Sequence, residues 1–390
     1  MREALSWLRD LSRYVGFGLE RVVRPRLGQG VDYREPRFRD QARLVVERLH
    51  PRRMSLRVDA ILQETPTTRT FRFVRTDGAL PPFRAGQYVN LYVEIAGVRT
   101  SRPYSISSAP GSDHLDLTVR DNPGGFVASY LLEHLAEGDV VETSGPAGSF
   151  YYEPLIHREE LVFLAGGSGI TPFMSMLRDQ ARRGWPLRIQ LLYGSRSPDD
   201  VLFADELAAL AESTDRFSWC SVISEPPPGY DGPTGLLDAP RLRDALGVPG
   251  GRMFFVCGPN RMYDLCLRSL EELAVPPHRV RRELYGPPSD VTAEPGWPES
   301  VDAGTTFRVD VLGVRVFDAR AGEPLLNAFE RHHVVAPALC RSGECSACRT
   351  RILAGQVFMP AGTGVRESDA RYGYVHACVA YPISDLKIRL

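Results

Sequence analysis

The chain has 390 residues, which is too long for one ordinary hydrophobic core and predicts two or three domains. Its hydrophobic content of 43% and charged content of 24% are typical of a soluble globular protein, and its formal net charge of -1 excludes a general attraction to nucleic acid. No apolar run is long enough to span a membrane and no secretory signal pattern opens the chain. We therefore expect a cytoplasmic protein whose cysteines are thiols or metal ligands.

Residues 1–53 form a basic segment, with 13 arginines against 7 acidic residues. Apolar side chains recur at helical spacing from Leu5 to Val22, while Arg9 and Arg13 lie off this stripe. A basic amphipathic helix can rest on an anionic membrane surface, dock on a partner, or pack against its own chain. These alternatives stay open for residues 1–50, and the first would place the protein at the inner face of the membrane.

Residues 54–155 contain short strand patterns separated by turn residues, and one helical pattern, "FVASYLLEHL". This texture predicts an antiparallel β-barrel with a helix. The stretch "RPYS" and the two glycines before the helix together supply a guanidinium, an aromatic face and free helix amides, which fit a flavin nucleotide. The residues predicted to bind it are Arg102, Pro103, Tyr104, Ser105, Gly124, Gly125 and Ser129.

In residues 156–286, apolar strand patterns alternate with helical patterns, which predicts a parallel sheet with helices on both faces. The turn "GGSGITP" follows the first strand, where open α/β sheets bind ligands, and "CGP" follows a later one. This turn lacks the G-x-G-x-x-G pattern of ordinary Rossmann dehydrogenases, and a glycine-rich turn alone is also compatible with a mere tight connection. The predicted dinucleotide-binding residues here are Gly166, Gly167, Gly169, Thr171, Pro172, Cys257, Gly258 and Pro259.

The second strand of this region ends in "YGSRSPDD", which brings Ser195 and Arg196 to the same sheet edge. A hydroxyl and a guanidinium there can hold the 2'-phosphate of NADPH. The same arginine could instead be merely solvated, so the sequence favours NADPH but leaves NADH open.

Residues 287–305 are proline-rich and predict an extended linker, semi-rigid where prolines are dense. Residues 306–390 follow as a final short-stranded module with the cysteines Cys340, Cys345, Cys348 and Cys378. The spacing C-x4-C-x2-C with a distant fourth cysteine is that of plant-type 2Fe-2S ferredoxins. Structural zinc is the alternative, although it more usually shows paired C-x2-C motifs or histidines.

Five motifs occur in one order: R-P-Y-S, G-G-x-x-x-S, G-P-x-G-x-F, G-G-S-G-I-T-P and C-G-P. On these motifs, residues 54–285 resemble the ferredoxin-NADP reductase superfamily. With the cysteine module added, the chain is similar to the reductase components of oxygenases, hydroxylases and desaturases, such as the phenylacetyl-CoA epoxidase and phthalate dioxygenase reductases. The resemblance implies an antiparallel β-barrel flavin domain, an α/β parallel-sheet pyridine-nucleotide domain and an α+β ferredoxin-like (β-grasp) domain. It also implies FAD rather than FMN, because Gly145–Phe150 has the form of the FAD-binding members.

The resemblance further implies roles for single residues. Arg102 would contact the flavin phosphate, Tyr104 would lie on the isoalloxazine ring and Ser105 would hydrogen-bond the reactive flavin nitrogen. Cys257 would lie near the nicotinamide. A looser match, Glu-Leu-Tyr at 283–285, adds Glu283 to Ser105 and Cys257 as a predicted catalytic residue.

We therefore expect an NAD(P)H-dependent oxidoreductase that passes electrons through FAD and a 2Fe-2S cluster to an oxygenase, hydroxylase or desaturase partner. One alternative is an electron-transfer or docking protein, a tethered ferredoxin without significant NAD(P)H oxidation of its own. A second question is whether the partner is a soluble monooxygenase or a membrane desaturase. No nucleic-acid partner is expected.

Overall fold

The structure is a computed structural model that describes residues 40, 43–47, 51–121, 125–284, 286–288 and 290–390. The chain divides into two units, Met1–Leu49 and His50–Leu390. In the first unit residues 43–47 are helical, with Arg43 Nε 3.5 Å from Glu47 Oε1. The amphipathic helix predicted between Leu5 and Val22 lies outside the described residues. Across the described ranges, no helix is both long and apolar enough to cross a bilayer.

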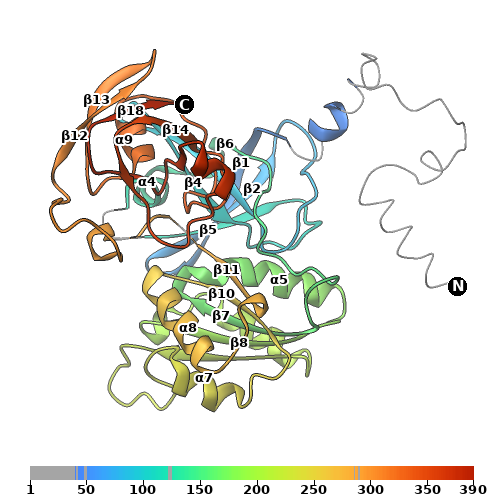
Figure 1. Cartoon of the computed structure of the whole chain (residues 1–390). Helices are drawn as coiled ribbons and strands as arrows, with labels where there is room; N and C mark the ends of the chain where they lie inside the picture. The colour runs from blue at the N-terminus through green and yellow to red at the C-terminus, as the bar shows by residue number, and fades with distance from the viewer. Residues whose placement is uncertain (1–39, 41–42, 48–50, 122–124, 285, 289) are drawn as a thin grey trace, which may run out of the picture. The chain divides into compact units, whose positions relative to one another are not determined.

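An antiparallel six-stranded barrel opens the second unit, as the sequence predicted (Figure 1). The strand order is β4-β3-β6-β1-β2-β5, and a bridge between Ile106 and Leu117 links the end strands β4 and β5. Alternating side chains such as Leu56 and Val58 fill its core. Ala96 and Gly97, both with positive φ, form the two-residue turn between β3 and β4. The elements are β1 (Met54–Thr65), β2 (Thr68–Arg75), β3 (Tyr88–Ile95), β4 (Val98–Ser105), β5 (Leu115–Arg120), α4 (Phe126–His134) and β6 (Val140–Thr143).

A five-stranded sheet follows, parallel throughout and in the order β11-β10-β7-β8-β9. Helices α5 and α6 cover one face and α7 and α8 the other, because apolar side chains from alternate strand positions enter two separate cores. The strands are β7 (Glu160–Gly166), β8 (Arg188–Ser195), β9 (Phe217–Ile223), β10 (Met253–Cys257) and β11 (Val280–Glu283). The helices are α5 (Thr171–Arg182), α6 (Ala204–Glu212), α7 (Ala239–Leu246) and α8 (Asn260–Glu272), with 3-10 turns η1 (Gly167–Ile170), η2 (Pro198–Asp200) and η3 (Pro277–Arg279).

The strand order places a topological switch point between β7 and β10. From β7 the chain moves outward through β8 and β9, and it then returns to the other side of β7 as β10 and β11. In open α/β sheets the crevice at such a point, beyond the carboxyl ends of the strands, is where ligands bind. The predicted "GGSGITP" and "CGP" turns follow these two strands.

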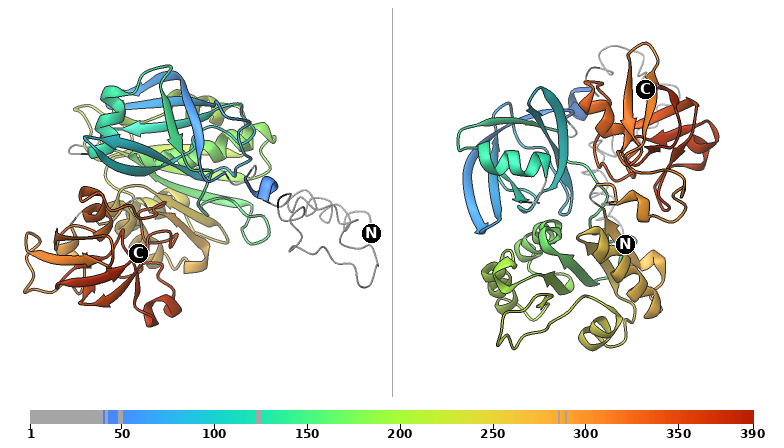
Figure 2. Two further views of the ribbon diagram at one scale, coloured as in Figure 1. Left: turned by 90° about the horizontal axis from the view of Figure 1, so that it is seen from above. Right: turned by 90° about the vertical axis from the view of Figure 1, so that its left-hand side faces the viewer.

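The C-terminal domain is a mixed sheet in the order β13-β12-β18-β14-β16, in which β12 and β18 are parallel and the other pairs antiparallel. Helix α9 packs Leu325, Leu326 and Phe329 into its core. Figure 2 shows this domain in orange and red, distinct from the blue barrel and the green parallel sheet. Its elements are β12 (Thr306–Val311), β13 (Arg315–Arg320), α9 (Leu325–Arg331), β14 (Arg349–Ala354), β15 (Val357–Phe358), α10 (Glu367–Arg371), β16 (Tyr374–His376), β17 (Tyr381–Pro382) and β18 (Leu386–Arg389).

The segment predicted as an extended linker packs against the C-terminal domain. It contains a 3-10 turn, η4 (Val291–Ala293), and the Trp297 ring meets Phe358 and Tyr381 edge-on at centroid distances of 5.2 and 6.3 Å. The Trp297 Nε1 donates to Val301 O at 2.9 Å. The proline content of the segment did not predict this packing, because the contact of Trp297 depends on two aromatic rings that lie far along the chain.

The ends of β7 and β10 approach so closely that side chains do not fit between them. A Cβ added to Gly169 would lie 2.3 Å from Cys257 O, and one added to Gly166 would lie 2.3 Å from Met262 Sδ. Glycine is thus required for packing at position 169, where the added atom would meet backbone, which is the tight-connection interpretation of this turn. The same bare backbone leaves room for a ligand at the switch point.

Replacing Gly169 with alanine is expected to destabilise the chain by about 2 kcal/mol, because the added methyl group overpacks a backbone contact. Thermal unfolding measures this change. Gly251→Ala is the matched control, since its Cβ would meet no atom within 4 Å. Equal unfolding temperatures for the two variants would contradict the close approach.

Candidate redox site

The four predicted cluster ligands lie in two pairs. The Cys340 side chain interacts with that of Cys345, and the Cys348 side chain with that of Cys378. All but Cys345 are buried. The backbone amides of Ser342 and Cys345 donate to Cys340 Sγ at 3.5 and 3.3 Å. Acceptance of the hydrogen bond from Cys345 lowers the pKa of Cys340, and the thiolate is the form that binds metal.

This two-by-two arrangement fits a two-iron cluster better than a zinc ion. A structural zinc would draw its four ligands around one point. Two irons with two protein sulfurs each need two pairs, and amides directed at a sulfur suit its negative charge.

Left-handed backbone at Arg341, Gly343 and Ser346 shapes the cysteine loop, residues 336–348, which precedes β14. The φ values of Arg341, Gly343 and Ser346 are 56°, 83° and 58°. A Cβ on Gly343 would also lie 2.9 Å from Val379 Cγ2. The loop is held further by a 2.6 Å hydrogen bond between the buried His376 Nδ1 and Gly343 O. These turns direct the backbone amides inward, toward Cys340.

On the barrel, Arg102 and Tyr104 share one face of β4 because they are two residues apart along a strand. Arg102 Nη1 donates to Thr100 Oγ1 and to Ser101 O, both at 2.8 Å. Burial, together with the nearby charge of Arg341, lowers the pKa of Arg102 to about 10. Pro103 lies between Arg102 and Tyr104, in register with β3. A half-buried guanidinium is well suited to hold an anionic group such as a phosphate.

Ser105, Cys257 and Glu283 are all buried at strand ends. In the parallel sheet Cys257 is in register with Glu283, and in the barrel Ser105 is in register with Tyr88. A Cβ at Gly148 would lie 2.8 Å from the Tyr88 ring and 3.8 Å from Glu283 Oε1, so this glycine separates the two side chains.

The cysteine loop also lies close to Tyr88 and Glu283. Burial raises the pKa of Glu283 well above its usual range, and the negative charges of Glu344 and Cys340 add to this. Burial likewise raises the pKa of Tyr88, and the charges of Cys340 and Cys345 contribute. The barrel, the parallel sheet and the cysteine loop therefore meet around Tyr88 and Glu283.

The helix predicted to bind a phosphate begins at Phe126 with Gly125 as its N-cap. Ser129, in its first turn, donates from Oγ to Asp121 Oδ1 at 3.2 Å. Gly124 lies outside the described residues. The structure thus shows a partner for the Ser129 hydroxyl that the sequence did not indicate.

At the switch point, Gly167 adopts a φ of 52° and Thr171 begins α5, with Pro172 in the first turn. The Thr171 hydroxyl donates to Ser168 O at 2.9 Å. Beyond β10, Pro259 is the N-cap of α8 and the Gly258 amide donates to Tyr263 Oη at 3.2 Å. The predicted glycine turns therefore lie side by side at the ends of β7 and β10.

Ser195 and Arg196 follow β8 at the same edge of the sheet. Ser195 Oγ donates to Asp200 O at 3.3 Å, and Arg196 Nε lies 3.2 Å from Asp200 Oδ2. The same carboxylate is 2.8 Å from Arg120 Nη2 of the barrel. The Arg196 side chain remains 64% exposed, so its guanidinium can still reach a ligand from solvent.

Comparison with known proteins matches this arrangement domain by domain. Residues 55–152 match the family model of the oxidoreductase FAD-binding domain, residues 163–267 that of the oxidoreductase NAD-binding domain, and residues 309–382 that of the 2Fe-2S iron-sulfur cluster binding domain. The chain is 30% identical over 340 residues to NADH oxidoreductase HCR of Escherichia coli (strain K12), covering 85% of this chain and 96% of that protein. It belongs to the flavin and iron-sulfur reductases of the ferredoxin reductase type.

One further relative and one solved structure match most of the chain. The glycine betaine monooxygenase reductase subunit of Pseudomonas aeruginosa (strain UCBPP-PA14) is 29% identical over 350 residues, which are 84% of this chain and 93% of that protein. The solved structure of phthalate dioxygenase reductase matches with a TM-score of 0.63 over 87% of this chain and 98% of that one, at 22% identity. The predicted three-domain fold and the predicted FAD, NAD(P)H and 2Fe-2S cofactors are confirmed.

The reductase also contains contacts between domains that the sequence did not predict. Asn90, buried on β3, donates from Nδ2 to Ala338 O of the cysteine loop at 2.9 Å. Arg341, which directly follows the first cysteine, reaches Thr100 of β4. On the other side, Arg282 Nη2 of β11 lies 3.4 Å from Gly362 O. The sequence shows that Arg341 lies inside the cysteine loop, but no neighbouring residue indicates that its partner is Thr100.

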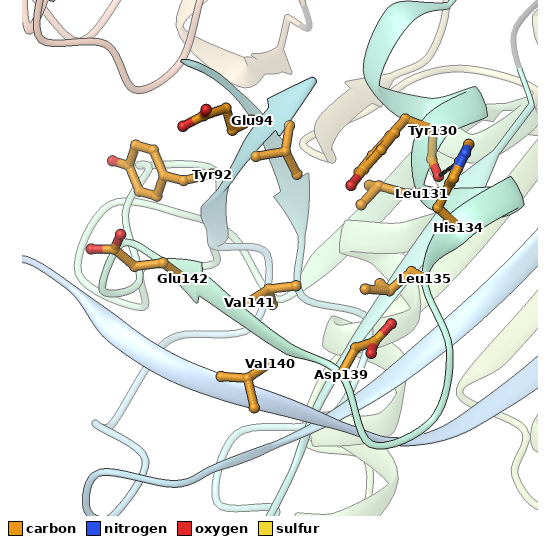
Figure 3. A pocket seen from close by; sticks show the side chains of 11 residues that line it. Tyr92, Glu94, Tyr130, Leu131, His134, Leu135, Asp139, Val140, Val141 and Glu142 are labelled. Atoms are coloured by element: carbon orange, nitrogen blue, oxygen red, sulfur yellow. Dashed lines mark hydrogen bonds between the residues drawn. The ribbon is translucent and has the colours of Figure 1, made fainter. Parts of the chain in front are cut away.

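A groove of about 310 Å3 lies between α4, β3 and β6 of the reductase's barrel (Figure 3). The rings of Tyr130 and His134 stack at 4.8 Å on the helix side, and Tyr92, Glu94 and Glu142 lie opposite. None of the residues predicted to bind flavin, nucleotide or cluster is among those that line it. The groove is therefore separate from the redox site.

Replacing Cys345 with serine is expected to abolish reduction of cytochrome c, a one-electron acceptor, and to leave bleaching of the flavin absorbance by NADPH intact. The reason is that Cys345 is a predicted cluster ligand, whereas the flavin and nucleotide residues lie on other elements. Rapid mixing under anaerobic conditions measures the two steps separately. Cys220→Ser, a half-buried cysteine of β9, is the control. Loss of both steps in Cys345→Ser would contradict this assignment.

Proposed function

We propose that this reductase delivers electrons to the oxygenase, hydroxylase or desaturase component of a separate redox partner. The observation that carries the proposal is the meeting of barrel, parallel sheet and cysteine loop around Tyr88 and Glu283. The names of its relatives support it, since one is a monooxygenase reductase subunit. A bound flavin converts the electron pair of a nicotinamide hydride into single electrons, which an iron-sulfur cluster requires.

In this proposal each predicted residue has one task. Arg102 holds the flavin phosphate and Tyr104 packs on the ring, while Ser105 and Cys257 position flavin and nicotinamide from the two strand ends. Glu283 closes the site from β11; its burial keeps water away from the reacting groups. The four cysteines hold the cluster.

The alternative function is a tethered ferredoxin that does not oxidise NAD(P)H. Mixing the purified protein with NADPH and cytochrome c distinguishes the two. We expect rapid loss of NADPH absorbance at a rate that depends on cytochrome c. A protein that leaves NADPH unoxidised, but that reduces cytochrome c after its own reduction by dithionite and removal of the excess dithionite, would be the tethered ferredoxin.

We further propose that Arg196 selects NADPH. Its exposed guanidinium lies beside Ser195 at the edge of the parallel sheet, where a ribose 2'-phosphate would accept a charge-assisted hydrogen bond. Asp200 orients Arg196 but also adds a negative charge beside the site proposed for the 2'-phosphate. A preference for NADPH therefore depends on the positive charge of Arg196.

Arg196→Ala is expected to raise the KM for NADPH by about tenfold, the value of one lost charge-assisted hydrogen bond, and to change the KM for NADH little. Steady-state assays with ferricyanide as acceptor measure both constants. Arg188→Ala, at the opposite end of the same strand, is the control. A similar rise for both nucleotides would show that Arg196 does not read the 2'-phosphate.

Finally, we propose that residues 1–50 attach the reductase to an anionic surface. The support is the sequence alone: a basic segment with an apolar stripe at helical spacing. Surface attraction of about 1 kcal/mol per arginine makes several arginines effective together.

The full chain is expected to sediment with vesicles that contain phosphatidylserine and to stay in solution with purely phosphatidylcholine vesicles. A chain lacking residues 1–50 should sediment with neither. Salt at 0.5 M should release the full chain if attraction to the surface is mainly electrostatic. Equal sedimentation of the truncated and full chains would exclude a membrane role for this segment.

A further inference from the structure

We propose that Thr100, Glu330 and Arg341 form a positioning network that holds the cysteine loop against the flavin side of the barrel. The inference rests on the proposed function, because it concerns the passage of electrons from flavin to cluster. It goes beyond that function in assigning three residues to the docking of one domain on another.

The Thr100 hydroxyl is the centre of the network, and its hydrogen-bonding capacity is full. It donates to Glu330 Oε2 at 3.0 Å and accepts from Arg102 Nη1 at 2.8 Å and Arg341 Nη2 at 3.2 Å. A hydroxyl has one proton to give and two lone pairs to accept, so all three are used. A second ion-paired contact joins Arg341 Nη2 to Glu330 Oε1 directly.

These residues connect the two redox centres. Thr100 lies two positions before Arg102, the proposed ligand of the flavin phosphate, on the same face of β4. Arg341 follows Cys340, a proposed cluster ligand, with a left-handed φ of 56° that turns it away from the regular backbone path. Glu330 lies on α9 of the C-terminal domain and receives hydrogen bonds from both sides.

Burial makes the network specific to one arrangement. The exposed fraction of Thr100 is 5%, and that of the Arg341 side chain is also 5%. If the loop moves away while these groups stay out of water, a carboxylate and a guanidinium lose their partners, which is costly in a medium of low dielectric constant. Arg341 Nε is buried without a hydrogen-bond partner, so the side chain is held from its Nη atoms, by Glu330, Thr100 and Asn327.

The network has a second consequence for the flavin. Arg102 and Arg341 both donate a hydrogen bond to the Thr100 hydroxyl. Docking of the cysteine loop and the orientation of Arg102 are therefore coupled. Coupling between two binding events is reciprocal. A docked loop therefore orients the proposed phosphate ligand, and a variant that breaks the network should release flavin more readily as well as slow electron passage.

The test uses the holoprotein with Thr100→Val, which keeps the shape of threonine but removes the hydroxyl, and with Thr100→Ser, which keeps the hydroxyl. Anaerobic rapid mixing with NADPH separates flavin reduction from the later bleaching of the cluster. We expect the ratio of the second rate to the first to fall about tenfold in Thr100→Val, as the loss of a hydrogen bond to charged groups implies, and to recover to within about twofold in Thr100→Ser.

Hydrogen exchange gives a readout that does not depend on turnover. Amides of residues 336–342 should exchange at least about fivefold faster in Thr100→Val than in the wild-type holoprotein, and Thr100→Ser should restore their protection. Unchanged exchange together with an unchanged rate ratio in Thr100→Val would overturn the proposal. Faster exchange with no change in the rate ratio would overturn it as well, because the contact would then not position the electron carriers.

Glu330→Gln keeps the inference testable if Thr100→Val does not retain its cofactors. This variant keeps the side-chain shape and removes the charge that pairs with Arg341. We expect the same direction of change, and wild-type behaviour would overturn the proposal. Failure of the proposed function looks different, because the wild-type cluster would then not be reduced by NADPH at all.

Discussion

The hydrogen bonds between strands β3 and β4 of the barrel and the C-terminal domain are the contacts on which the electron path depends. Asn90 bonds Ala338, and Thr100 bonds both Glu330 and Arg341. Each joins a polar group of one domain to a polar group of another, away from water, where an unpaired partner is costly. They place the cysteines next to the strand that ends at Ser105, the residue proposed to contact the flavin.

The parallel sheet meets the barrel through a different set of contacts. Ser175 Oγ on α5 donates to Ser108 O of the barrel at 2.7 Å, and Arg178 Nη1 donates to Ser107 O at the same distance. These bonds fix the carboxyl ends of β7 and β10 relative to the end of β4. A nicotinamide bound at the switch point would therefore face the barrel residues proposed to hold the flavin.

The sequence predicted the features that depend on local spacing. Strand alternation and turn residues indicated the barrel. The C-x4-C-x2-C pattern indicated the cluster, because the predicted ligands lie in one short loop plus one distant cysteine. The sequence also predicted a role for the glycines at 166 and 169 in binding a dinucleotide, and the structure shows that packing against the backbone of Cys257 already requires the second of them.

The sequence did not predict the contacts between residues that lie far apart in the chain. Thr100 and Arg341 lie 241 positions apart, and nothing in either local sequence names the other. The same holds for Asp200, which links Arg196 to Arg120 of the barrel, and for Trp297, which anchors the proline-rich segment on Phe358 and Tyr381. Residue type and spacing report what a segment can bind, whereas the fold decides which partner it meets.

The central claim is that one polypeptide carries electrons from NADPH through a flavin to a two-iron cluster. Anaerobic titration of the purified protein with NADPH, followed by absorbance and electron paramagnetic resonance, tests it most directly. The account predicts uptake of about three electrons per chain, two by the flavin and one by the cluster, with a paramagnetic signal from the reduced cluster. Uptake that ends at about two electrons, with no such signal from protein purified without oxygen, would contradict it.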